Sequence, residues 1–214
     1  PSEHEDQTGF EMALNFGYLF WTGGPKPGEE DDLSGSSGAI TPLNLGMGAR
    51  LVWPFSFGVQ LNAGFDLGAD GTKAVVDANP GFYARGHAGK EKKQLGFDVW
   101  GGIGLQPLAM QVIVLEARPI DPSMISPTAD PDAVASAIAM EKTGVSHVRT
   151  LQSINMPLEL GGTLFVTEGM GINLAMAFTF WFPQSSCLHD GNDRLCTSDG
   201  LDTQTSFFIG AGLS

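Results

Sequence analysis

The chain has 214 residues, with 24 Asp and Glu against 11 Lys and Arg and a formal net charge of −13. That acidity argues against binding to nucleic acid or anionic lipid head groups through a broad basic face. Charged residues make up only 16% of the chain, and 29 residues are glycine, so the sequence is charge-poor and glycine-rich. No apolar run approaches the ~20 residues that a membrane-spanning helix needs, which excludes a helical membrane protein.

Strict alternation of apolar and polar residues recurs along the chain. From Phe10 to Phe20 every second residue is apolar, and Glu11 and Asn15 lie between them. Alternation with a period of two predicts strands that have one apolar face. We expect eight strands, near residues 9–22, 40–54, 55–69, 93–107, 109–118, 151–166, 169–182 and 204–214.

The predicted connections alternate between short and long. Short turns are expected at 53–55, 106–108 and 167–169, and long polar loops at about 22–39, 70–92, 119–150 and 183–203. This arrangement is typical of an up-and-down outer-membrane barrel, and the strands reach the ~9–11 residues that span the hydrocarbon layer. The third long loop contains one short predicted helix, at 131–142, with Asp130 as its N-cap and Pro131 at its first position.

The composition of the two faces decides where each one points. The polar face consists mainly of Gly, Asn, Ala, Ser and Thr, which suits the narrow interior of an eight-stranded barrel, whereas the bulky apolar face suits contact with lipid. A soluble calycin-type barrel is the alternative, but its outer face should carry many Lys and Glu residues. Seven charged residues share the polar face and are expected to form an interior network: Glu11, Arg50, Asp66, Asp98, Glu116, Arg118 and Glu159.

Aromatic residues gather near the ends of the predicted strands. Such girdles mark the two membrane interfaces of transmembrane barrels, although ordinary core aromatics are an alternative explanation. The predicted interface aromatics are Phe10, Tyr18, Phe20, Trp21, Trp53, Phe55, Phe180, Trp181 and Phe182.

With these features the sequence resembles the small Gram-negative outer-membrane barrels of the OmpA transmembrane-domain/OmpX type. The resemblance implies an all-β, eight-stranded antiparallel barrel over residues 9–214 and an N-terminal periplasmic tail over 1–8. It further implies surrounding outer-membrane lipid, insertion by the barrel assembly machinery and extracellular long loops. One departure is the end of the sequence, Gly212-Leu213-Ser214, where such barrels usually carry a terminal aromatic residue.

Cys187 and Cys196 lie close together in a polar segment, without the spacing of a zinc site. A local disulfide is the simplest interpretation and suits an oxidising compartment; two free thiols are the alternative. Acidic residues and one asparagine in two long loops could bind Ca²⁺, but they lack EF-hand spacing, so solvated surface charge is the preferred interpretation and no cofactor is expected. These residues are Glu29, Glu30, Asp31, Asp32, Asp190, Asn192, Asp193, Asp199 and Asp202.

For function, we expect no enzyme and no nucleic-acid partner, but a surface, adhesion or scaffold role in which the long loops dock a partner in the cell envelope. The interior charges are expected to plug the barrel by pairing. A narrow cation channel or small-molecule conduit is the first alternative. The second comes from the resemblance, because some similar barrels modify lipid A with His and Ser at the outer rim; here His147 lies beside Ser146 and near Ser153.

Overall fold

The computed structural model describes residues 9–23, 39–52, 54–66, 72–90, 96–115, 148–167, 169–190, 193–198 and 201–214. These residues form antiparallel strands and no helix that is long and apolar enough to cross a bilayer. The strands are β1 (Gly9–Gly23), β2 (Ala39–Val52), β3 (Phe55–Asp66), β4 (Thr72–Lys90), β5 (Phe97–Leu115), β6 (Val148–Thr167), β7 (Met170–Asp190), β8 (Asp193–Thr197) and β9 (Gln204–Leu213). The predicted helix at 131–142 lies outside this part of the chain.

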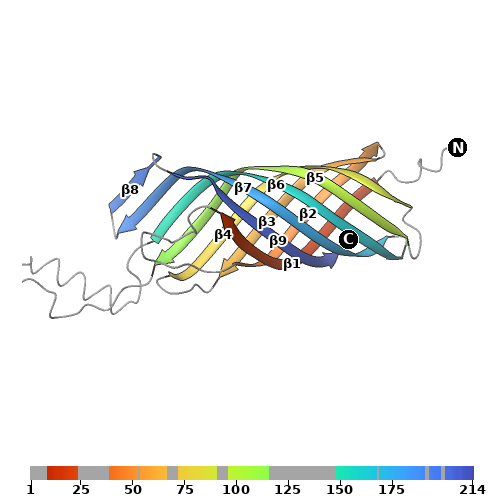
Figure 1. The fold of residues 1–214 in the computed structure, drawn as a ribbon, viewed down its shortest axis with the longest axis horizontal. Coiled ribbons are helices and arrows are strands. Elements are labelled where there is room, and N and C mark those ends of the chain that lie inside the picture. The colour runs from red at the N-terminus through yellow and green to blue at the C-terminus, as the bar shows by residue number, and fades with distance from the viewer. Residues whose placement is uncertain are drawn as a thin grey trace, which may run out of the picture.

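Eight of the strands close into a ring (Figure 1). Each strand from β1 to β7 pairs with the next, β7 then pairs with β9, and β9 pairs with β1, as in Tyr18 opposite Ile209. The prediction of an eight-stranded antiparallel barrel is therefore confirmed, and its last strand closes against its first. β8 stands apart from the ring, because its pairing is with β7 alone in the described sheet.

The two ends of the barrel differ. The short connections between β2 and β3 and between β6 and β7 lie at one end, which also holds the last residues of β9. We call this the short-turn end. At the opposite end, β7 continues to Asp190 and folds back as β8 (Figure 1), so the predicted loop at 183–203 contains a hairpin. We call this the hairpin end.

Two segments were predicted wrongly. One error omits a strand of the ring and the other adds one, so the predicted number of ring strands is still eight. Residues 72–90, predicted as a loop, form β4, which pairs along its length with β3 and β5. The predicted hairpin of 93–107 and 109–118 is one strand, β5. Its expected turn at 106–108 is a β-bulge: Gln106 pairs with Asn155 and Ala109 with Ser153, so β5 has one residue more than β6 between these rungs.

The apolar side chains face outward, as the alternation predicts. Phe10 is 68% exposed and Leu108, on the bulge of β5, is 75% exposed. Polar side chains such as Asn15, Asn155 and Ser206 are instead buried inside the ring. An outer wall this apolar needs lipid around it, so the barrel spans a membrane and the soluble calycin-type alternative is wrong.

Candidate functional site

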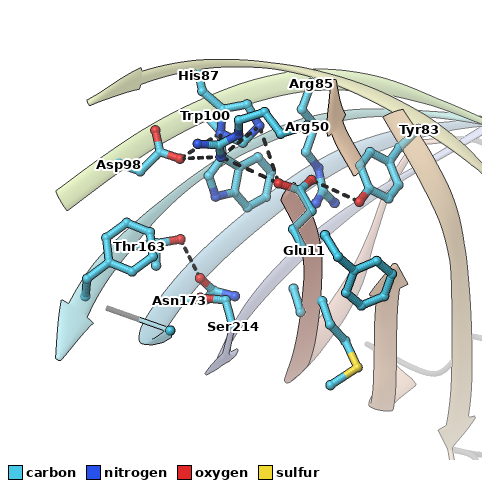
Figure 2. Close-up of a pocket in the computed structure, with 15 residues that line it drawn as sticks. Glu11, Arg50, Tyr83, Arg85, His87, Asp98, Trp100, Thr163, Asn173 and Ser214 are labelled. Carbon is cyan, nitrogen blue, oxygen red and sulfur yellow. Dashed lines mark hydrogen bonds and ion pairs between the residues drawn. The ribbon is translucent and has the colours of Figure 1, made fainter. Parts of the chain in front are cut away.

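Charged side chains from five strands, β1, β2, β4, β5 and β6, meet inside the barrel near the short-turn end (Figure 2). Arg50 of β2 lies with its Nη2 3.0 Å from Oδ2 of Asp98 on β5 and 3.5 Å from Oε2 of Glu11 on β1. Arg50 and Asp98 are both buried, so each charge depends on the other for compensation. The pair reaches past β3 and β4, which lie between β2 and β5 in the ring.

His87 of β4 completes this first cluster. Its Nδ1 lies 2.7 Å from Oδ2 of Asp98, and its Nε2 lies 2.8 Å from the hydroxyl of Ser56. We assign the proton to Nδ1, because a carboxylate can only accept; Nε2 then accepts from the Ser56 hydroxyl. Arg50 Nη2 lies 2.8 Å from the same Nδ1, and this contact is not a hydrogen bond in that tautomer, since both atoms are donors.

A second ion pair lies beside the first. Arg85 of β4 donates from Nε and Nη2 to Oε2 of Glu159 on β6, over 2.8 and 2.7 Å. Its guanidinium also lies 4.0 Å from the ring centre of Tyr83 and 4.3 Å from that of Trp100. The Tyr83 hydroxyl donates to Glu11 over 3.1 Å and so links the two clusters. We call the whole group, from Glu11 to Glu159, the charge network.

A cavity of about 170 Å³ borders the charge network. Arg50, His87, Asp98 and Tyr83 line it, together with Ser214 near the short-turn end. The hydrogen-bond order Ser56–His87–Asp98 is that of a catalytic triad. Ser56, however, is 0% exposed and does not line the cavity, so a substrate in that cavity does not reach its hydroxyl. In this geometry the three residues hold charges in place across the lumen.

The structure places four of the seven predicted network residues together: Glu11, Arg50, Asp98 and Glu159. Only the backbone of Asp66 is described, and Glu116 and Arg118 lie beyond the described ranges. Sequence reasoning missed Tyr83, Arg85 and His87, because residues 70–92 were incorrectly predicted to be a loop. The signal was present in the sequence, because from Ala74 to Ala88 every second residue is small or apolar, while polar residues such as Asp77, Arg85 and His87 lie between them.

Most of the predicted interface aromatics that the structure describes face outward, and their place at a membrane interface stays a prediction. Phe10, Tyr18, Phe20, Phe55 and Phe182 are exposed, and Phe180 is half-buried. Trp181 is a correction: it is 2% exposed, and its indole N–H donates to Ser206 over 2.8 Å inside the barrel. Trp181 is therefore a core residue. Nothing is described of Trp53 or of the Trp21 side chain.

The middle of the lumen is lined by amide side chains. Asn15 donates to Asn44 over 3.4 Å, and Asn44 donates to Asn62 over 2.6 Å, across β1, β2 and β3. Further along the wall, both amide atoms of Gln60 and the Nε2 of Gln106 are buried and have no hydrogen-bond partner among the described residues. Buried polar atoms of this kind are usually satisfied by water, so this section of the lumen is suited to hold water molecules.

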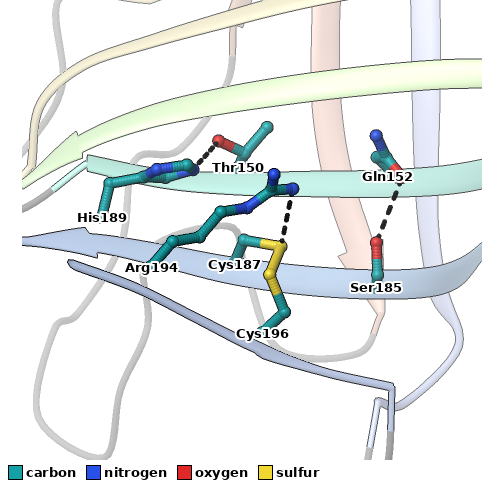
Figure 3. The surroundings of a disulfide bond; sticks show 7 residues. All are labelled: Thr150, Gln152, Ser185, Cys187, His189, Arg194 and Cys196. Carbon is teal, nitrogen blue, oxygen red and sulfur yellow. Dashed lines mark hydrogen bonds between the residues drawn. A yellow bond between two sulfur atoms is a disulfide. The ribbon is translucent and has the colours of Figure 1, made fainter. Parts of the chain in front are cut away.

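At the hairpin end the predicted disulfide between Cys187 and Cys196 is present (Figure 3). The two cysteines are direct cross-strand partners of β7 and β8. Of the predicted Ca²⁺-binding residues only Asp202 has a described side chain, and His147 of the lipid A alternative is not described. Ser153 faces the lumen and donates to Asn155 over 2.7 Å. The described residues contain no group of three or more His, Cys, Asp or Glu placed to hold a metal ion.

Comparison with known proteins gives the fold. No protein-family model and no curated protein sequence matches the chain. The crystal structure of Neisserial surface protein A is similar, with a TM-score of 0.51 and 12% identity over 96% of this chain and 97% of that one. The outer membrane protease OmpT from Escherichia coli matches with a TM-score of 0.42 and 11% identity over 96% and 94%, too weak a likeness to argue from. With its closed ring and apolar outer wall, this chain has the fold of a small eight-stranded outer-membrane β-barrel.

Proposed function

We propose that the protein is a non-catalytic scaffold of the Gram-negative outer membrane, whose hairpin end faces the cell exterior and docks a partner of the cell envelope. The observation that carries this proposal is the contrast between the two ends. At the short-turn end, the Arg50–Asp98 and Arg85–Glu159 pairs lie inside the lumen. At the other end, β7 and β8 continue beyond the ring as a disulfide-linked hairpin.

The hairpin end also receives the longest connections. β1 ends there at Gly23 and β2 begins at Ala39, and β5 and β6 are joined there by residues 116–147. Because the chain is strongly acidic and these segments carry many of its carboxylates, a basic or Ca²⁺-bridged partner fits this surface. Exposed side chains on β8, with Leu195 at 72%, add an apolar contact point.

The test compares two equally exposed leucines in living cells. A photoreactive amino acid replaces Leu195 on the hairpin in one variant and Leu108 on the lipid-facing wall in the other, with exposures of 72% and 75%. We expect protein crosslinks from position 195 and lipid crosslinks from position 108. Replacing residues 116–147 by a short Gly-Ser turn should remove the protein crosslinks. A band that runs at a different position on SDS gels with and without boiling, the heat-shifted band, shows that the barrel still folds.

Two results would overturn the proposal. One is a folded barrel, with residues 116–147 intact, that forms no protein crosslinks from position 195. The other is a protein crosslink that forms at position 108 and is absent at 195, which would move the interface to the lipid-facing wall.

A narrow conduit is the second candidate. The amide atoms of Gln60 and the Nε2 of Gln106 favour it, because they have no partner among the described residues and so suit a hydrated lumen. Conductance in planar bilayers separates the two functions. The scaffold predicts no unitary currents from the wild-type protein. A conduit predicts currents that change when Asp98→Asn removes one carboxylate of the charge network.

A further inference from the structure

The two sulfur atoms of the hairpin disulfide have different surroundings. Cys187 belongs to β7, which pairs with β6 on its other side, and is 4% exposed. Cys196 belongs to β8 and is exposed to solvent, like its neighbours Arg194 and Leu195. Exchange with a thiol requires in-line access to the sulfur that is attacked, so an incoming thiolate reaches Cys196 and not Cys187.

A cation contacts the buried sulfur. Arg194, which lies opposite His189 in the β7–β8 pairing, donates from Nη2 to Sγ of Cys187 over 3.3 Å (Figure 3). A guanidinium beside a sulfur stabilises the negative charge that develops there when the disulfide opens. A better-stabilised thiolate leaves faster in thiol–disulfide exchange. Exposure and charge therefore favour the same direction of cleavage, from two independent observations.

We propose that the Cys187–Cys196 disulfide is a thiol–disulfide exchange site of fixed direction. An incoming thiolate attacks Sγ of Cys196 and forms a new S–S bond with it, the Cys187–Cys196 bond breaks, and its electron pair leaves on Sγ of Cys187 beside Arg194. No net oxidation occurs, since one disulfide replaces another. The hairpin end thus carries a mixed disulfide on Cys196 and a thiolate on Cys187, which can return to the original bond by the reverse step.

The hairpin is built to survive this opening. Four other residue pairs join β7 to β8, among them Leu188 with Leu195 and His189 with Arg194. Leu188 also packs against Val75 and Ile113 at this end of the barrel. β7 therefore stays anchored in the wall when the disulfide opens, and exchange changes the exposed strand without unfolding the barrel.

The experiment uses the full chain, folded in detergent, with glutathione as the probe. After short incubation at pH 7.5 the free thiols are blocked with N-ethylmaleimide, and peptide mapping locates each label. We expect glutathione on Cys196 and N-ethylmaleimide on Cys187. Arg194→Gln should slow formation of the adduct about three- to tenfold, because the leaving thiolate loses its charged partner. Leu195→Gln is the matched control on the same strand and should change the rate by less than about twofold.

Arg194→Lys keeps the charge without the planar fork and should fall between wild type and Arg194→Gln. The heat-shifted band of each variant shows that its barrel is folded. Glutathione found mainly on Cys187 would overturn the proposed direction. An Arg194→Gln variant that reacts as fast as wild type would overturn the role of the guanidinium. A folded wild-type protein that forms no adduct in excess glutathione would overturn the exchange site itself.

Discussion

The Arg85–Glu159 pair offers the sharpest test of the charge network, because both residues are buried and each compensates the other. Glu159→Leu leaves the guanidinium between Tyr83 and Trp100 without a carboxylate. Breaking a buried pair from one side costs about 3–5 kcal/mol, since the remaining charge is uncompensated. Replacing both partners removes that charge, so Arg85→Leu combined with Glu159→Leu should recover most of the loss.

The assay is urea unfolding in lipid vesicles, followed by tryptophan fluorescence and by the heat-shifted band. With a slope of about 1–3 kcal/mol per M, the single variant should unfold at a midpoint lower by about 2 M. Glu159→Gln is the control for shape, since it keeps an acceptor for Arg85 but not the charge. A double variant as unstable as Glu159→Leu would refute the reasoning, because the loss would then come from packing and not from an unpaired charge.

Two further pairs of variants test the interior packing by the same unfolding assay. A Cβ at Gly161 would overlap the Trp100 ring, whereas one at the next residue, Gly162, meets only a backbone oxygen at 3.6 Å. Gly161→Val should therefore lose about 1–3 kcal/mol through overpacking, and Gly162→Val clearly less; equal losses would contradict the placement of Trp100. Trp181→Ala should cost about 3–5 kcal/mol because Trp181 is buried, and Phe182→Ala, on the lipid-facing side, less than half of that; the reverse order would place Trp181 outside the barrel.

The fold could be predicted from the sequence because a barrel wall imposes one rule on every strand. Lipid outside and polar contacts inside require alternation, and β1, β2, β3 and β6 follow it with bulky apolar residues on the outer face. β4 was not predicted as a strand, because its outer face is partly built from small residues such as Ala84 and Ala88. Its inner face carries the charged or polar residues Asp77, Arg85 and His87. A charged segment with small apolar residues has the composition of a loop, and only its period of two distinguishes it.

The candidate site could also be predicted only in part. Glu11, Arg50, Asp98 and Glu159 were predicted as interior charges because they share a face with small polar residues in clear strands. Their pairing depends on the angular position of each strand around the ring, which sequence does not supply. Trp181 shows a conflict between two signals: its parity with Thr179 placed it inside, while its clustering with Phe180 and Phe182 suggested the membrane interface. The structure follows parity, because a side chain on a strand cannot change face without a bulge.

The bulge of β5 allows this rule to be tested directly. Pro107 and Leu108 both face outward, between inward Gln106 and Ala109, and β5 exceeds both β4 and β6 by one residue across this stretch. Deleting Leu108 should therefore restore regular pairing and leave every later residue of β5 on its present face. Deleting Ile103, in a regular part of the same strand, should turn one part of β5 inside out.

The measurement is barrel formation in lipid vesicles, scored by the heat-shifted band and by the urea midpoint. We expect the variant without Leu108 to fold, with a midpoint near that of wild type, and the variant without Ile103 to fail. If neither folds, Pro107 and Leu108 are needed for more than accommodating an extra residue. If both fold, the face of each side chain does not control assembly, and the alternation from which the barrel was predicted is not what specifies it.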